Sequence, residues 1–178
     1  MYKEINKLHF DAHLGCANLT GGQQRAKRGK LVETMIEAIW TSLGGTFTSD
    51  KFLTQRGDIE IKMALDRNLY KGDKLVAMVE CKSYLDLCYL ERAEWNAREL
   101  SEGADIQAPK FILALQDSVN ATSMEYVLAG KHIEDIFFLV DRKRSSTKPL
   151  YKQEFYEDID EGLFDKFYTY FHSLYQNS

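Results

Sequence analysis

Two charged residues, Glu80 and Lys82, stand at the end of a run of apolar residues that begins at Leu75. In a β-strand, side chains two residues apart project to the same face, so the acid and the lysine would lie side by side. Burying such a pair is unfavourable unless the two groups are paired or take part in chemistry. The run therefore predicts a buried strand that carries a functional pair at its end.

A second acidic residue, Asp58, follows Gly57 and opens a stretch of alternating polar and apolar residues, 57–63. Pairing of this stretch with 75–81 through a turn at 71–74 would bring Asp58 and Glu80 together at one edge of a sheet. Adjacent carboxylates repel, which raises one pKa unless a divalent cation lies between them. Their oxygen ligands suit Mg²⁺, and Lys82 beside them would orient or deprotonate an attacking water. The trio predicts metal-assisted hydrolysis of a phosphodiester.

The elements that would position these residues follow from hydrophobic periodicity. Helices are predicted at 24–43, 87–100, 124–129 and 159–175, and strands at 57–63, 75–81, 111–115 and 136–140. This order predicts an α/β fold, a mixed sheet with helices on its faces and a packed C-terminal helix. The chain of 178 residues is expected to form a single domain, 1–178.

Composition narrows the function classes. A hydrophobic share of 44% with 28% charged residues is typical of a globular protein, and the net charge is −4. No apolar run reaches the roughly 18 residues of a membrane helix, and the first ten residues lack the apolar stretch of a secretory signal. Three scattered cysteines favour a reducing compartment, so a cytoplasmic protein without a membrane partner is expected. The sequence contains no P-loop motif, so nucleotide hydrolysis is not indicated.

The segments Gly57-Asp58 and Val79-Glu80-Cys81-Lys82 together resemble the PD-(D/E)xK nuclease superfamily, and within it the type II restriction endonucleases. Position 57 is Gly, where the name of the superfamily has Pro. The resemblance implies that Asp58, Glu80 and the backbone carbonyl of Cys81 bind Mg²⁺ and that Lys82 assists the water. It also implies a restriction-endonuclease-like αβββαβ core at about 30–140, with an N-terminal extension and a C-terminal helix appended.

The same resemblance implies further partners and a further ligand. Many members carry a glutamate on the first core helix a few residues after a glycine, and Gly29 followed by Glu33 matches that pattern. Glu33 is therefore an expected catalytic residue and accessory metal ligand, whereas Glu37 is expected further toward solvent. The implied substrate is double-stranded DNA cut at a short specific site by a homodimer. A cognate DNA methyltransferase is expected in the same system, not as a stable partner.

Other interpretations stay open. A structure-selective repair or recombination nuclease, such as a junction resolvase, or a non-catalytic DNA-binding protein on the same fold would share this pattern. Two other acid-x-lysine triplets, 60–62 and 141–143, lack either a buried strand or a following strand to complete the core. Two histidines, His9 and His13, have zinc-ligand spacing without a further ligand pair, which favours a surface or capping role.

Basic and amide side chains of three segments, 20–30, 120–122 and 142–148, are candidate DNA contacts, chiefly to phosphates. The candidates are Arg25, Lys27, Arg28, Lys30, Asn120, Arg142, Lys143 and Arg144.

Overall fold

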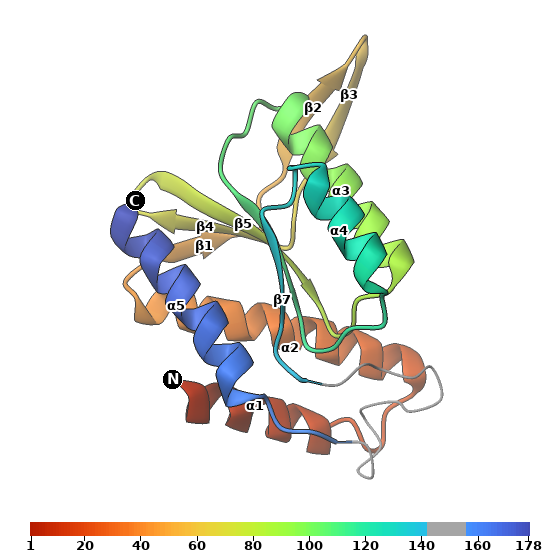
Figure 1. Ribbon diagram of the computed structural model, residues 1–178, viewed down its shortest axis with the longest axis vertical. Coiled ribbons are helices and arrows are strands. Elements are labelled where there is room, and N and C mark those ends of the chain that lie inside the picture. Colours follow the sequence, from red (N-terminus) through yellow and green to blue (C-terminus); the bar gives the residue numbers. More distant parts are fainter. Residues whose placement is uncertain (142–155) are drawn as a thin grey trace.

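The computed structural model describes residues 1–141 and 156–178, apart from the side chain of Arg25 (Figure 1). These residues form an α/β protein with five helices, a mixed five-stranded sheet and a separate β-hairpin. The helices are α1 (Tyr2–Leu14), α2 (Gly21–Ser42), α3 (Leu87–Glu102), α4 (Ala121–Ala129) and α5 (Glu161–Asn177). The strands are β1 (Thr46–Thr48), β2 (Phe52–Arg56), β3 (Ile59–Met63), β4 (Arg67–Lys71), β5 (Lys74–Lys82), β6 (Lys110–Ala114) and β7 (Asp135–Phe138). The predicted α/β class, mixed sheet and C-terminal helix are confirmed.

The main sheet has the order β1-β4-β5-β6-β7. Strand β5 is central: it pairs with β4 in antiparallel and with β6 in parallel orientation. Its apolar sequence fits this place, because a strand covered on both faces lacks polar alternation. The tight turn between β4 and β5 contains Gly72, whose positive φ of 58° a glycine adopts without strain.

Helices cover both faces of the sheet (Figure 1). Helices α1, α2 and α5 pack on one face around Trp40, Phe111 and Phe171, which are fully buried. Helices α3 and α4 pack on the other face through a smaller cluster that includes Leu90 and Ile112. Among the described residues, no helix is both long and apolar enough to cross a membrane.

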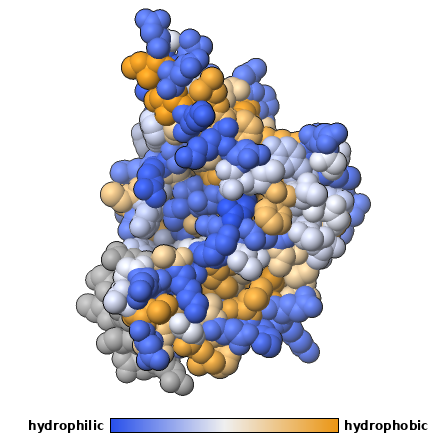
Figure 2. All heavy atoms as spheres, turned by 180° about the vertical axis from the view of Figure 1, so that it is seen from behind, coloured by the Kyte–Doolittle hydropathy of each residue, from blue (hydrophilic) through white to orange (hydrophobic). Residues whose placement is uncertain are grey.

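The hairpin β2–β3 projects beyond the sheet, at the top of Figure 1. It corrects the predicted strand pairing: 57–63 contains β3, which pairs with β2 and not with β5. Its inner face rests on the C-terminal end of α3, where the backbone N–H of Gln55 donates to the carbonyl of Gly103 and Arg56 pairs with Glu99 at 2.9 Å. Seen from behind, hydrophilic residues gather in the hollow at the foot of the hairpin (Figure 2).

Helix α1 buries both histidines, which corrects the expected surface or capping role. His9 is fully buried and its Nε2 lies 2.9 Å from the carbonyl oxygen of Glu157, which fixes this nitrogen as the donor. His13 is also buried, and its ring lies tilted against Tyr156 with the ring centroids 4.5 Å apart. Burial lowers the pKa of His9 to about 4, and the nearby Arg28 adds to the shift. The folded protein therefore holds His9 in its neutral form.

This burial predicts a loss of stability in acid. An unfolded histidine takes up its proton near its ordinary pKa, while folded His9 resists protonation until about pH 4. The contribution of neutral His9 to the free energy of unfolding is therefore fully present above the pKa of the unfolded chain. About 3 kcal/mol of it is lost as the pH falls from about 6.5 to about 4. Urea unfolding of the wild type and of His9→Phe at pH 7 and pH 4 measures it. An equal loss in both proteins would contradict the assignment.

Candidate active site

The alternation of side chains along β5 decides which residues face which layer. Ala77 and Val79 belong to the core beneath α2, whereas Met78 packs toward Leu100 of α3. Glu80 and Lys82 continue the series of Met78 and so project toward α3, as expected from their spacing. Glu80 is only 4% exposed, so its carboxylate lies inside the protein at the end of the central strand.

The carboxylate that the fold brings to this pair belongs to Asp66, the residue directly before β4. Arg67 is opposite Val79 in the β4–β5 ladder, and the next step of the ladder places Asp66 beside Glu80. The backbone N–H of Cys81 donates to Asp66 Oδ2 at 2.7 Å. This bond fixes the Asp66 carboxylate at the end of β5.

The structure does not bring Asp58 into the site, which corrects the prediction for this residue. Asp58 is exposed in the turn between β2 and β3, next to Gly57, whose φ is 60°. Gly57-Asp58 is therefore a turn sequence of the kind that favours hairpins, where positive φ is needed. The residue that the register selects instead is Asp66.

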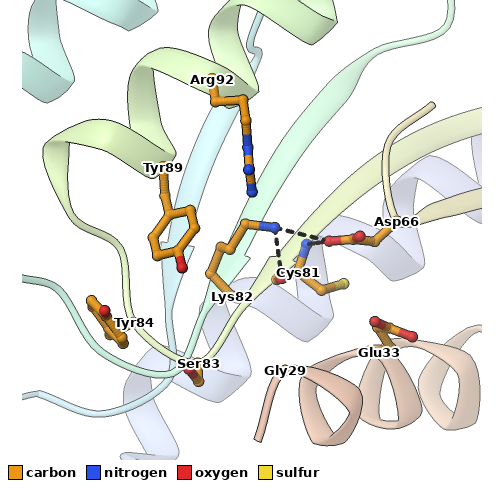
Figure 3. Close-up of a pocket in the computed structure, with 9 residues that line it drawn as sticks. All are labelled: Gly29, Glu33, Asp66, Cys81, Lys82, Ser83, Tyr84, Tyr89 and Arg92. Carbon is orange, nitrogen blue, oxygen red and sulfur yellow. Dashed lines mark hydrogen bonds and ion pairs between the residues drawn. The ribbon is translucent and has the colours of Figure 1, made fainter. Parts of the chain in front are cut away.

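Three oxygen atoms surround the ammonium group of Lys82. Its Nζ lies 2.5 Å from Glu80 Oε1. The same atom lies 3.1 Å from Asp66 Oδ2 and 3.1 Å from the carbonyl oxygen of Cys81 (Figure 3). The two carboxylates raise the pKa of Lys82 and outweigh the opposing effect of its burial, so the amine stays protonated. The arrangement is thus a cation held by two carboxylates and one backbone carbonyl.

The titration of Glu80 and Cys81 follows from the same surroundings. Burial raises the pKa of Glu80, and the charge of Asp66 adds to this, while Lys82 opposes both effects. Burial also raises the pKa of the Cys81 thiol well above its ordinary value. Because a protonated thiol is a poor nucleophile and metal ligand, Cys81 contributes backbone groups to the site.

Glu33 of α2 reaches the rim of the site, as predicted from its sequence position. It forms an ion pair with Arg67, and Lys30 Nζ lies 3.0 Å from its Oε2. Glu37, expected further toward solvent, is equally enclosed and accepts from Arg67 Nε at 2.6 Å. Arg67 also donates to the backbone carbonyl of Asp66. This guanidinium therefore connects α2 to the strand end that carries Asp66.

These groups open onto a pocket of about 220 Å³. Glu33, Asp66 and Lys82 lie on one side of it, and Tyr89 and Arg92 of α3 lie on the other (Figure 3). The α3 helix begins where the Asp86 side chain accepts from the backbone N–H of Tyr89 at 2.9 Å. This cap places the first turn of α3 directly over the site.

The predicted DNA contacts divide into separate groups. Lys27 is exposed and donates to the carbonyl of Gly15, Arg28 is buried, and Lys30 is bound to Glu33 and Glu37. Asn120 caps α4, where its side chain accepts from the N–H of Ser123. Arg142, Lys143, Arg144 and the side chain of Arg25 lie outside what the structure describes.

Asp66, Tyr89 and Arg92 were missed at the sequence level. The turn at Gly72-Asp73 was a usable signal for strand β4 but not for its register. Counting back along a regular hairpin from the Lys71–Lys74 pair places Leu65 opposite Glu80, and a bulge between Leu69 and Tyr70 shifts the register by one so that Asp66 takes this place. Strand β4 was not predicted because it contains the polar residues Arg67 and Asn68. Both side chains are buried, and both are paired with polar partners. The positions of Tyr89 and Arg92 depend on how α3 docks on the sheet.

The donor chemistry fits a divalent oxygen-binding cation. Within the described residues no group of three or more histidine, cysteine or acidic side chains could hold a metal ion. The site instead offers two carboxylates, Asp66 and Glu80, and one backbone carbonyl, Cys81, all in contact with a single ammonium. Magnesium is commonly bound by one or two carboxylates, with waters and substrate phosphate supplying the other ligands.

Comparison of the sequence with protein-family models and with curated proteins finds no match.

Proposed function

We propose that the protein is a Mg²⁺-dependent endodeoxyribonuclease of the PD-(D/E)xK type, similar to type II restriction endonucleases. The observation that carries this proposal is the convergence of Asp66 Oδ2, Glu80 Oε1 and the Cys81 carbonyl on one ammonium at the end of the central strand. The same three oxygens would hold Mg²⁺ once the Lys82 ammonium moves aside on its flexible stem. The acidic residue of the first half of the motif is then Asp66, after Leu65, rather than Asp58.

The order of elements supports the same assignment. Helix α2, strands β1, β4 and β5, helix α3 and strand β6 follow the αβββαβ order of the restriction-endonuclease-like core. The hairpin β2–β3 is an insertion in that order. Glu33 lies on the first helix of this core, on the side of the pocket, where the resemblance expects an accessory acid.

Each side chain then has a defined task. Asp66 and Glu80 bind Mg²⁺, which when bound would polarise the phosphodiester and lower the pKa of a bound water. Lys82, on its flexible stem, orients the attacking water or stabilises negative charge on the phosphate. Glu33 is held by Arg67 and Lys30, so its role is to tune the charge of the site as an accessory acid.

The partners follow from the proposed chemistry. Cutting both strands of a short palindrome needs two sites related by a two-fold axis, which a homodimer provides. The natural substrate is therefore proposed to be double-stranded DNA, with a cognate methyltransferase in the same system. All three cysteines are free thiols, which supports the proposed cytoplasmic location.

Digestion of plasmid DNA tests the function. Purified protein is incubated with several unmodified plasmids in Mg²⁺ or in EDTA, beside Glu80→Gln. Discrete fragments are expected only with wild-type protein in Mg²⁺, and sequencing of their ends gives the cleavage site. Cleavage of four-way junctions but not of plasmids would instead indicate a structure-selective nuclease. DNA binding without any cleavage would indicate a non-catalytic protein.

A further inference from the structure

A second pocket adjoins the candidate active site. It measures about 390 Å³ and lies at the foot of the β2–β3 hairpin, where Lys51, Lys62 and Asn96 are among its lining residues. Asp66 lines both this pocket and the pocket of about 220 Å³ that contains Lys82. The two pockets therefore meet at the carboxylate that we assign to metal binding.

One face of α3 runs along both pockets. Tyr89 and Arg92 line the first pocket and Asn96 lines the second. These positions are three and four residues apart, so they lie on the same side of the helix. From Tyr89 to Asn96 the helix rises by roughly 10 Å at about 1.5 Å per residue. The two pockets thus form one continuous track that passes over Asp66.

Three cations on this track have no ion pair with any residue that the structure describes. Lys51 and Lys62 are exposed at the foot of the hairpin, and Arg92 is exposed on α3 with its guanidinium 5.3 Å from the ring centre of Tyr89. By contrast, Lys82 and Arg67, which line the same pockets, are each bound to two carboxylates. The unpaired cations are therefore the positive charges available to an anionic ligand.

We infer that this track binds the backbone of the DNA strand that is cut, with Arg92 at the phosphate over the site and Lys51 and Lys62 at phosphates toward the hairpin. The inference rests on the proposed nuclease function and specifies how its substrate is held. Tyr89 is a positioning residue, because its ring supports the Arg92 guanidinium by a cation–π contact. Figure 2 shows hydrophilic residues gathered below the hairpin, where we place this DNA strand.

Salt dependence of binding tests this assignment, because each phosphate contact contributes a fixed slope. The logarithm of the binding constant falls with the logarithm of salt concentration by about 0.9 for each phosphate neutralised. The probe is a fluorescein-labelled duplex of about 30 base pairs, a length chosen to span the interface, centred on the site mapped from plasmid fragments. Binding is measured by anisotropy in Mg²⁺, with Lys82→Ala present in every protein to stop cleavage.

In that background, Arg92→Ala and Lys62→Ala should each make the salt dependence less steep, reducing the magnitude of the slope by about 0.9. The triple variant, which also carries Lys51→Ala, should reduce the magnitude by about 2.7. Lys166→Ala is the matched control: Lys166 is exposed on α5, on the opposite side of the sheet, and its change should leave the slope unaltered. Circular dichroism verifies that each variant is folded.

The outcomes separate the track from the proposed function. Wild-type protein that cleaves DNA, together with an unaltered slope in the triple variant, would overturn the track and leave the nuclease assignment intact. A wild-type protein that neither cuts nor binds any DNA would overturn both. An equal loss of slope in Lys166→Ala would show a general charge effect and would also reject the track.

Discussion

Replacing Asp66 by asparagine is expected to lower the rate of DNA cleavage by about 10³-fold or more. The amide keeps the shape of the side chain but removes one of the two negative charges that hold the metal. Metal ions contribute several kcal/mol of transition-state stabilisation, and each factor of ten in rate corresponds to about 1.4 kcal/mol. Single-turnover cleavage of a labelled duplex with the mapped site measures the rate.

Asp58→Asn is the matched control for this change. Asp58 is exposed at the tip of the hairpin, so this variant makes the same chemical change outside the pocket. We expect its cleavage rate to stay within about threefold of the wild type, since surface substitutions of this kind have small effects. The reverse pattern, with loss of cleavage in Asp58→Asn and none in Asp66→Asn, would reject the site described above.

Replacing Arg67 by methionine is expected to lower the free energy of unfolding by about 3–5 kcal/mol. The guanidinium is almost fully buried between Glu33 and Glu37, and methionine fills similar space but leaves both carboxylates without their buried partner. Removing the buried member of an ion pair costs this much because Glu33 and Glu37 then keep only the exposed Lys30 as a cationic partner. Urea unfolding at pH 7 measures the change.

Lys30→Met provides the comparison, because Lys30 contacts the same two carboxylates from the solvent side, with 60% of its side chain exposed. Exposed ion pairs contribute about 0–1 kcal/mol, so this variant should unfold almost like the wild type. Equal effects of the two substitutions would show that burial of Arg67 does not decide its contribution.

The sequence predicts the helices and strands around the site better than it predicts which residues form the site. The long apolar run of β5 and the periodic helices α2, α3 and α5 are determined by local patterns, and the structure confirms them. Asp66 was not predicted because the strand that follows it, β4, was not recognised. Strand β4 contains Arg67 and Asn68, whose burial depends on partners far along the chain. Long-range pairing of this kind leaves no periodic signal.

Asp58 illustrates the opposite error. A glycine followed by an aspartate before an alternating stretch is equally typical of a hairpin turn and of a motif that opens a core strand. The choice between them depends on which strand pairs with β5, and only the fold settles that: β4 occupies the place expected for β3. A count of residues back from the turn at Gly72 excludes Asp58, but it reaches Leu65 rather than Asp66 because the bulge between Leu69 and Tyr70 shifts the register by one.

The anchoring of the hairpin has a consequence for how this protein can change over evolutionary time. Strands β1 and β4 pair directly at its base, and Asn68 donates to Thr48 Oγ1 and to the carbonyl of Asp50. The chain between β1 and β4, which contains the hairpin, therefore leaves the sheet and returns to it at the same place. Doubling the length of such a loop adds only about 0.6 kcal/mol to the entropic cost of closing it. The length of the hairpin can therefore change while Asp66 keeps its register beside Glu80, as long as Lys51 and Lys62 remain at the foot of the hairpin.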